Sequence, residues 1–452
     1  MNWQAWLADL SQSRCVLVEL VHAEGTLYLA TMPYQSSPTD MPANTAYDDV
    51  ITAMPEISRH ESQPVSLGDL AFHAPNAGQL IRYQWQRVMI YLGAPDWPKS
   101  AFKLISMSRI ERVMRSAVDR VQVEFVDDHQ HLSNRLPLPR LYREPEGTVL
   151  PFIIGKPFQV RPLNTFPALL EYAVGTYGGA DEYISVVSVR DSGVLVNYTP
   201  VGGGRFRLNS PPAGEVTASY ATGNYWLLPL LTELTGGDPM NLVMGKGFDH
   251  ELAGLAVAAL VPEAATYRVL IDALTRGLDV SVQYVPDGSM EIIHYRLDRE
   301  TDYTVSEDDM VAGSVVHIDT LPAASRITIK YAQNFAVLSQ VAGGAEAEAV
   351  ALQSAYQHYS LDNPNPVPNN ELIIETALAD LNGAQVVAER LMRTRSIVRY
   401  AYRFELFAVG IELRDGDLLD LHHAGWGLSG PALVTKVEYR IGANRVQIEV
   451  LM

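Results

Sequence analysis

The feature that most constrains the fold is an internal repeat, in which one strand-like segment occurs twice. Arg120–Val126 reads Arg-Val-Gln-Val-Glu-Phe-Val, and Arg445–Leu451 reads Arg-Val-Gln-Ile-Glu-Val-Leu. Alternation of apolar and polar residues is typical of a half-buried β-strand. Self-similarity within one chain indicates a repeated structural unit. Both segments are therefore predicted to be strands of one kind of sheet.

The segments before the two heptapeptides also correspond. Each copy has a short strand, a tryptophan and a longer strand, in the same order. They are Val88–Leu92, Trp97 and Phe102–Ile110 in the first copy, and Leu418–Leu421, Trp426 and Leu433–Ile441 in the second. We interpret them as two copies of one β-unit, near residues 80–130 and 410–452. The alternative, that alternating Val, Gln and Glu strands look alike by chance, stays open at this point.

The composition bounds the classes of protein to which the chain can belong. The 452 residues suffice for two to four domains, and 47% hydrophobic residues can form buried cores. No run of about 18 apolar residues predicts a membrane span, and the N-terminus lacks the features of a secretory signal. Cys15 is the only cysteine, so no intrachain disulfide or thiolate metal cluster is expected.

The net charge argues against a protein that clamps nucleic acid. The chain has 34 basic and 52 acidic residues, a formal charge of −18. Binding to duplex DNA needs Lys and Arg to neutralise phosphates. An acidic surface can still let DNA pass without holding it, because like charges repel.

The pattern of elements divides the chain into four parts. We expect a β-domain with the first copy at 1–139, a β-rich module at 140–222 and a small α/β module at 223–300. A second β-domain, with one helix and the second copy, is expected at 301–452. Helices are predicted at Trp3–Leu10, Leu227–Leu234, Asp249–Leu260, Thr266–Leu274 and Asp380–Ser396.

Three irregular or short features complete this prediction. Tyr47–Glu61 is expected to hold one strand ending in Ile57, and Gly343–Asn370 to form an excursion or mobile loop. Gly202-Gly203-Gly204 is followed by a strand-like segment and by no Lys-Ser/Thr pair, so a tight turn at positive φ is favoured over a phosphate-binding loop.

Two histidine-containing segments are candidate metal sites. The densest polar cluster comprises Asp127, Asp128, His129 and His131. Aspartate and imidazole can bind a divalent metal, but a solvated turn is the favoured interpretation. His422 and His423 are adjacent; on a strand they would face opposite sides and could not share one metal.

The candidates for catalytic groups are weak. Ser429 lies in Gly427–Gly430 and is interpreted as a loop serine without a local partner. The carboxylate pairs are Asp415 with Asp417 and Asp308 with Asp309; sequence alone does not separate a glycosidase pair from surface charge. Cys15 is expected to be a buried small residue rather than a nucleophile. No catalytic, cofactor-binding or metal-binding residue is nominated.

The order of these elements resembles the central hub proteins at the tail tip of long-tailed, non-contractile bacteriophages, which are related to the hubs of contractile-tail baseplates. The resemblance covers most of the chain and depends on the order of elements rather than on one motif. The segments that carry it are Leu27–Ile57, Leu67–Leu92, Leu136–Tyr142, Tyr183–Val196, Arg205–Tyr220, Glu371–Glu375, Ala388-Glu389-Arg390 and Leu413–Asp417.

The resemblance implies a mainly β fold with α+β parts, in which two related tube-type β-barrel domains carry inserted modules. Three chains then give six similar units, which can join a six-fold tail tube to a three-fold tip. Some relatives hold an iron–sulfur cluster through cysteines; this chain has only Cys15, so no cofactor is expected. Cell-wall hydrolase domains, present in some relatives, have no visible signature here.

The function that the resemblance implies is structural. The chain is expected to be a homotrimeric, non-enzymatic hub of the virion, assembled in the host cytoplasm. Its expected partners are a distal tail or tail-tube protein, a tape-measure protein and tip, fibre or receptor-binding proteins, with DNA passing through an acidic channel. Two alternatives remain: a tail-associated cell-wall or polysaccharide hydrolase that uses acidic residues, and a glycan- or receptor-binding protein with Trp97 or Trp426 exposed.

Overall fold

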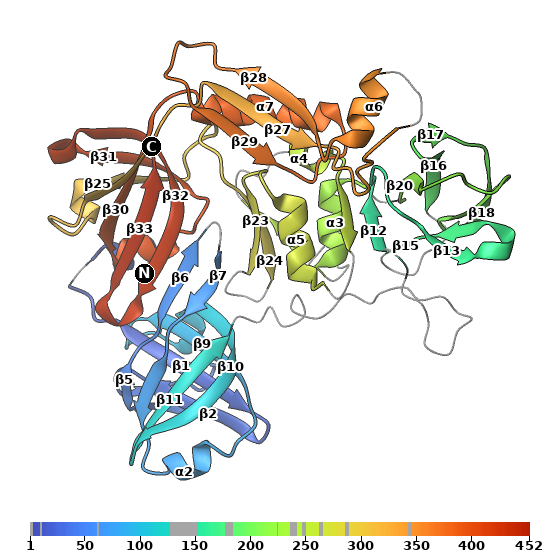
Figure 1. Cartoon of the computed structure of the whole chain (residues 1–452). Helices are drawn as coiled ribbons and strands as arrows, with labels where there is room; N and C mark the ends of the chain where they lie inside the picture. The colour runs from blue at the N-terminus through green and yellow to red at the C-terminus, as the bar shows by residue number, and fades with distance from the viewer. Residues whose placement is uncertain are drawn as a thin grey trace.

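Two large sheets, one from each end of the chain, lie on one side of the molecule, and the middle of the chain forms smaller sheets and helices beside them (Figure 1). The computed structural model describes residues 3–9, 11–60, 63–126, 150, 152–176, 184–223, 225–235, 242–245, 250–261, 265–284, 289–341 and 346–452. Strands outnumber helices in this part of the chain, which confirms the predicted mainly β fold with α+β parts.

The N-terminal sheet contains the first copy of the repeat. Its strands, in spatial order, are β3 (Tyr34–Gln35), β4 (Ala46–Asp49), β2 (Gly25–Ala30), β1 (Cys15–His22), β9 (Trp85–Gly93), β10 (Lys103–Ala117), β11 (Arg120–Val126), β8 (Leu70–His73) and β5 (Ile51–Ala53). Helix α1 (Trp3–Ala8) precedes the sheet, and helix α2 (Ala77–Leu80) joins β8 to β9.

The C-terminal sheet contains the second copy. Its strands, in spatial order, are β25 (Tyr303–Ser306), β31 (Leu418–His423), β32 (Leu428–Arg440), β33 (Arg445–Leu451), β30 (Arg399–Phe407) and β26 (Val316–Leu321). A hairpin from the N-terminal part of the chain, β6 (Glu56–His60) and β7 (Gln63–Leu67), joins this sheet through β32. Among the described strands, neither large sheet closes on itself to form a barrel.

One hydrophobic core extends across both large sheets. The apolar residues of β11 and β33 face it at every second position, as the alternation in the sequence predicts. They are Val121, Val123 and Phe125 in the first copy, and Val446, Ile448 and Val450 in the second. Trp6 and Leu7 of α1 are buried in the same core. The two copies therefore share their apolar interior.

The middle of the chain forms five smaller sheets among the described residues. They are β15 (Gly175–Thr176), β12 (Phe152–Gly155) and β22 (Ala258–Val261); β13 (Leu163–Phe166), β14 (Glu171–Ala173), β19 (Arg205–Leu208) and β18 (Tyr198–Gly202); β17 (Val194–Leu195), β16 (Ser185–Asp191) and β20 (Val216–Ala221); β21 (Leu242–Met244), β24 (Met290–His294) and β23 (Val280–Tyr284); and β28 (Gln357–Asp362), β27 (Arg326–Tyr331) and β29 (Glu371–Glu375).

Three helices of this region pack together in a second core. Helices α3 (Leu227–Leu234), α5 (Tyr267–Thr275) and α7 (Leu381–Arg395) contribute buried leucines to it, together with Ile327 and Ile329 of β27. Asp380 caps α7 by accepting a hydrogen bond from the backbone N–H of Gly383, and Thr266 caps α5 in the same way through Val269. The predicted helices at these places, and the N-terminal helix, are confirmed.

Three predicted elements are wrong. Asp249–Leu260 forms only α4 (His250–Ala253), because Ala258–Val261 pairs with β12 as strand β22. The segment expected to be an excursion or a mobile loop, Gly343–Asn370, is not a mobile loop, because it contains α6 (Glu346–Gln353) and β28, and β28 pairs with β27 along its whole length. Tyr47–Glu61 holds parts of three strands rather than one, which pair with different neighbours.

Candidate functional site: the paired sheets

The two copies of the repeat have the same arrangement of strands. Strands β9, β10 and β11 lie side by side and antiparallel in the N-terminal sheet, and β31, β32 and β33 do so in the C-terminal sheet. Beyond β11 lies β8, and beyond β33 lies β30, both antiparallel. The tryptophan of each copy, Trp97 or Trp426, lies in the connection between its first two strands. The order predicted from the sequence is confirmed.

Both copies also have a β-bulge at the same place in the last hairpin. In each copy one residue of the longer strand is skipped between two successive pairs. The flanking pairs are Ile110–Phe125 and Arg112–Glu124 in the first copy, and Val434–Val450 and Lys436–Glu449 in the second. A bulge bends and twists a strand at a defined residue. Two unrelated strands with alternating apolar and polar residues would not be expected to have a bulge at the same position. The alternative that the two heptapeptides look alike by chance is therefore not supported.

A cross-strand ion pair follows the bulge in both copies. The Arg112 Nη2 atom lies 2.7 Å from Oε2 of Glu124. At the corresponding place, the Lys436 Nζ atom lies 3.7 Å from Oε1 of Glu449, which Arg403 also approaches to 2.9 Å. The second copy therefore keeps the charges of the pair but shares its carboxylate between two cations.

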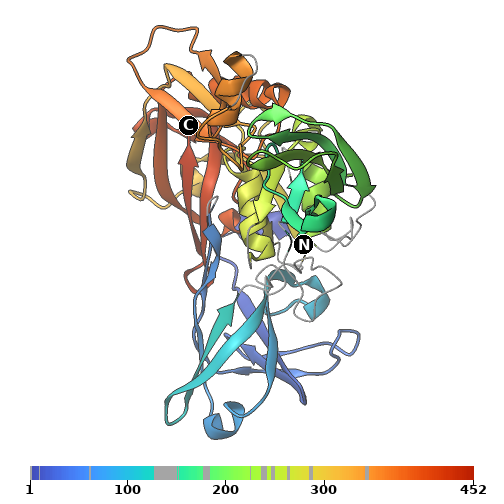
Figure 2. The same ribbon diagram turned by 45° about the vertical axis from the view of Figure 1, so that its right-hand side comes forward.

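The β6–β7 hairpin links the two sheets and is called the arm here. Figure 2 shows it reaching from the N-terminal sheet to the C-terminal one. Strand β6 pairs antiparallel with residues 436–440 of β32, and Ile57 is buried in the shared core. Arg440 at the end of this ladder binds Glu405 (2.6 Å), Glu438 (2.8 Å) and, more loosely, Glu56 of the arm (3.9 Å).

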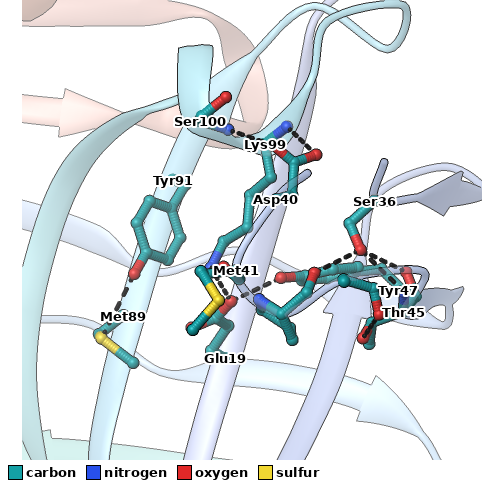
Figure 3. A network of polar contacts seen from close by, with 12 residues as sticks. Glu19, Ser36, Asp40, Met41, Thr45, Tyr47, Met89, Tyr91, Lys99 and Ser100 are labelled. Atoms are coloured by element: carbon teal, nitrogen blue, oxygen red, sulfur yellow. Dashed lines mark hydrogen bonds and ion pairs between the residues drawn. The ribbon is translucent and has the colours of Figure 1, made fainter. Parts of the chain in front are cut away.

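A polar network fastens the 36–45 loop to the N-terminal sheet (Figure 3). Its centre is Glu19 of β1, which is 4% exposed. One carboxylate oxygen of Glu19 accepts a hydrogen bond from the Tyr47 hydroxyl and lies 2.5 Å from Lys99 Nζ. Burying one charge without a partner is costly, so the opposite charge and the hydroxyl make this position tolerable. Burial raises the pKa of Tyr91, beside this pair, to about 12.

Asp40 is the second anchor of the same loop. Its carboxylate accepts hydrogen bonds from the backbone N–H groups of Ser37, Lys99 and Ser100. Burial by itself would raise the pKa of Asp40, but these hydrogen bonds together hold the pKa below its ordinary value. The loop is therefore tied to the β9–β10 connection by interactions that need an ionised carboxylate.

A cavity of about 340 Å³ lies where the C-terminal sheet meets the α/β region and α1. Asp415 and Asp417, expected either as a catalytic pair or as surface charge, are both buried beside it. Asp415 accepts hydrogen bonds from Gln283 (2.6 Å) and the Tyr295 hydroxyl (2.7 Å), and Asp417 accepts one from the backbone N–H of Arg414. The contacts of Asp415 join the turn before β31 to the α/β region.

The remaining candidates for catalysis, the pair Asp308 and Asp309 and the residue Cys15, have contacts that stabilise the fold. Asp309 accepts hydrogen bonds from the backbone and hydroxyl of Ser306 in a capping box, with Asp308 beside it. Cys15 is completely buried, and burial raises the pKa of its thiol to about 12, so it is not a reactive thiolate. The interpretation of Cys15 as a buried small residue is confirmed.

The glycine and histidine candidates follow the predicted geometry. Gly202, Gly203 and Gly204 have φ values of 94°, 59° and 70° and form the turn between β18 and β19. Nε2 of His422 lies 3.1 Å from Oδ2 of Asp420, whereas Nδ1 of His423 lies 3.5 Å from Oε2 of Glu307, so the two rings face different carboxylates.

The cluster of Asp127, Asp128, His129 and His131 lies outside the described residues. Within them, no group of three or more His, Cys, Asp or Glu side chains is placed to hold a metal ion.

One arrangement was missed at the sequence level. Ser429 is not an isolated loop serine: it lies on β32 opposite His422, and its Oγ atom is 3.3 Å from Nδ1 of that ring. Nε2 of the same ring faces Asp420, so Ser429, His422 and Asp420 form a chain of contacts. The sequence contains a signal for this arrangement. Residues 420 and 422 share one face of a strand, and the hairpin places residue 429 opposite residue 422. All three side chains are exposed or half-buried on the face of the sheet.

The tryptophans proposed as glycan-binding surfaces differ from each other. Trp97 packs against Trp6 and Trp3, with ring centroids 4.8 and 6.1 Å apart, and is only partly exposed. Trp426 is 48% exposed and meets Tyr402 edge-on at 6.3 Å. In the described part of the chain, no helix is long and apolar enough to cross a membrane.

Comparison with known proteins gives a distant structural likeness. No protein-family model matches the sequence, and no curated protein matches it. A tail protein from Neisseria meningitidis matches 97% of this chain and 96% of its own, with 8% identity and a TM-score of 0.48. A prophage tail protein from Listeria monocytogenes matches 97% and 94%, with 9% identity and a TM-score of 0.46. A virion chain of a gene transfer agent matches 70% and 87%, with 14% identity and a TM-score of 0.43.

Proposed function

We propose that this chain is a structural protein of a phage-type tail, in which it forms the hub that joins the tail tube to the tip. The observation that carries the proposal is the pair of related sheets, which have the same strand order and the same bulge. Two such units in one chain allow three chains to present six similar units around an axis. The structures compared above include tail proteins, but their likeness is too low to carry the proposal.

The proposed assembly is a homotrimer in the virion, put together in the host cytoplasm. Its neighbours are a distal tail or tail-tube protein, a tape-measure protein and tip, fibre or receptor-binding proteins. Under this proposal the parts at 1–139 and 301–452 form the ring, and those at 140–222 and 223–300 are modules inserted between them. Limited proteolysis followed by mass spectrometry tests these boundaries.

DNA is proposed to leave through the centre of the ring without being held there. The −18 net charge supports an acidic wall, since a basic wall would bind phosphates that must be released again during transit. Screening by salt limits this repulsion to about 8–10 Å, so its effect is modest. A lumen lined chiefly by Lys and Arg in the assembled ring would refute this part of the proposal.

The test of the hub function uses particles and the purified chain. Antibodies against the chain should label one end of the tail in electron micrographs, and the purified chain should sediment as a trimer. Labelling along the whole tail, or a stable six-copy ring, would contradict the proposal.

A second candidate function, hydrolysis, has one specific observation in its favour: the contacts of Ser429, His422 and Asp420. These exposed side chains lack the buried carboxylate that orients the base in serine hydrolases. Ester and peptidoglycan hydrolysis by the purified chain, abolished by Ser429→Ala, would favour this candidate. Equal turnover by the variant would assign any observed activity to a contaminant.

A further inference from the structure

The contact between the two large sheets uses one strand edge from each end of the chain. Strand β6 comes from the N-terminal part, and residues 436–440 of β32 come from the C-terminal part. If the related sheets extend beyond the repeated segments, each edge has a counterpart: one for β6 in the C-terminal part and one for 436–440 in the N-terminal part. The register of the sheets identifies both.

The counterpart of β6 is β26. Strand β11 aligns Arg120 with His73 of β8, and β33 aligns Arg445 with Phe407 of β30. Counting six residues back along the chain, across residues 68 and 69 that separate β7 from β8, places Leu67 of β7 at the position of Ala401 of β30. Leu67 pairs with Ile57 of β6, and Ala401 pairs with Asp319 of β26. Ile57 and Asp319 therefore occupy equivalent places, as do Ser58 and Thr320.

The counterpart of residues 436–440 is the outer part of β10. The shared bulge aligns Arg112 with Lys436, and the next pairs align Val113 with Val437 and Arg115 with Tyr439. Strand β9 pairs with β10 only from Lys103 to Arg109. Beyond Arg109, on the side where β32 receives the arm, β10 faces no strand in the described part of the chain.

Both counterparts are open strand edges. Strand β26 ends the C-terminal sheet and is exposed at its first five residues, Val316 and Ile318 included. On β10, Arg112 and Arg115 are exposed, whereas the equivalent Lys436 is half-buried and Tyr439, which pairs with Ile57 of the arm, is buried. An open edge presents unpaired backbone N–H and C=O groups, which favour pairing with another strand.

The charges of the two edges are complementary. Strand β26 holds one acidic residue, Asp319, and neither Lys nor Arg. Residues 112–117 of β10 hold two basic residues, Arg112 and Arg115, and no acidic one. Opposite charges steer two surfaces together and fix their register.

We propose that β26 of one copy of this chain pairs with the outer part of β10, residues 112–117, in a second copy. The contact repeats between chains what β6 and β32 form within one chain. Since Ile57 pairs with Tyr439, the equivalent register places Asp319 of one copy opposite Arg115 of the other. The contact is head-to-tail and closes into a ring when the rotation permits. It deepens the hub function proposed above and rests on the ring proposed there.

The local contacts of the two side chains are compatible with this pairing. Arg115 donates hydrogen bonds to the carbonyls of Ala117 and Val118, which hold its guanidinium at the end of β10. Asp319 accepts one from the backbone N–H of Thr320 through Oδ1. Both side chains are exposed in the single chain.

Disulfide cross-linking of the full chain tests the contact directly. A chain with both Arg115→Cys and Asp319→Cys should form, on oxidation, covalent oligomers that end at the ring size. Directly paired strand residues lie within the Cα separation of about 4.4–6.8 Å that a disulfide allows. Each single variant is a control and should give no oligomers beyond a dimer, because Cys15 is buried. A chain that assembles into trimers but does not cross-link overturns the contact and leaves the hub function standing. A chain that does not self-associate at all counts against both.

Charge exchange provides a second measurement that does not depend on oxidation. Arg115→Asp and Asp319→Arg should each weaken self-association about tenfold or more, as like charges then face each other. The double exchange should restore it. Asp308→Arg is the matched control, because it changes the same charge outside β26 and should have a smaller effect. Equal weakening by the control, or no rescue by the double variant, would refute the assigned register.

Discussion

The two large sheets share one pattern of strands but differ in what covers it. In both, the inward residues of the last strand are buried and a bulge precedes a cross-strand ion pair. Outside that pattern the copies diverge: Tyr439 pairs with Ile57 of the arm and is buried in the shared core, whereas the equivalent Arg115 is exposed, and Trp426 is exposed where Trp97 packs on α1. The last strand is the same in both sheets, whereas the strand edge and the connection that holds the tryptophan have different contacts.

The opposite edges of the sheets differ as well. Strand β1 pairs antiparallel with β9, whereas β25 pairs parallel with β31 at the same place. Strand β1 is buried on both faces, since Cys15 and Leu17 on its outer side pack against Tyr34, Tyr47 and Phe102 in a small second cluster. The N-terminal copy has therefore gained a second layer, and the network of Glu19 and Asp40 fastens it.

Truncation of one core residue in each copy should have the largest effect. Leu70 and Phe404 occupy equivalent places and are completely buried. Phe404→Ala should lower the free energy of unfolding by about 3–5 kcal/mol and Leu70→Ala by about 2–5 kcal/mol. Because the sheets share one core, both should shift the same urea transition. Two separate transitions, each moved by one variant only, would show that the copies unfold independently.

The Glu19–Lys99 pair should distinguish the N-terminal sheet from the C-terminal one. Glu19→Ala leaves a mostly buried ammonium without its carboxylate, so we expect a loss of about 3 kcal/mol. Urea unfolding measures it, and Lys99→Met combined with Glu19→Met is the control. The double variant should be less destabilised than Glu19→Ala alone, because it leaves neither charge buried and unpaired. A double variant that is destabilised at least as much as Glu19→Ala would contradict this interaction.

Acid should weaken the N-terminal sheet through Asp40. Its pKa is depressed in the folded chain, so protons bind first to the unfolded chain. The stabilisation by Asp40 is thus complete above the ordinary carboxyl pKa of about 4, and it is lost as the pH falls through the lower folded value. The urea midpoint of Asp40→Asn should fall less steeply between about pH 4 and pH 2 than that of the parent. Parallel curves would contradict this assignment.

The arm should be weakened measurably by the loss of Arg440. This side chain binds three carboxylates at the end of the β6–β32 ladder and is about one-third exposed. We expect Arg440→Ala to cost about 1 kcal/mol, since exposed ion pairs contribute little except in networks. Hydrogen exchange of β6 amides should increase in this variant. Unchanged exchange there, with loss of stability elsewhere, would separate Arg440 from the arm.

The smallest effect is expected at the ion pairs that follow the bulges. Arg112 is 60% exposed and Lys436 is 25% exposed. Replacing either by Ala should change the free energy of unfolding by no more than about 1 kcal/mol. The change at Lys436 should be the smaller one, because Arg403 remains to bind Glu449. Salt titration of the unfolding midpoint measures both, and a larger loss at Lys436 would contradict this ranking.

The sequence by itself determined the elements whose signals are local. The alternation in residues 120–126 and 445–451 predicts two strands with one buried face each, and the repeated order predicts two related sheets. Capping residues such as Asp380 and Thr266 define the starts of their helices, because each satisfies a backbone N–H that the helix leaves free. These features depend on residues that are close together in the sequence, so they can be predicted from the sequence alone.

Only the tertiary structure decided which strands meet across long separations. Residues 258–260 are predicted to end a helix but pair with β12, more than a hundred residues earlier. The arm joins a sheet made of residues from the other end of the chain. A single residue of register reverses which face each side chain occupies. Register depends on packing throughout the sheet, and no short stretch of sequence contains it.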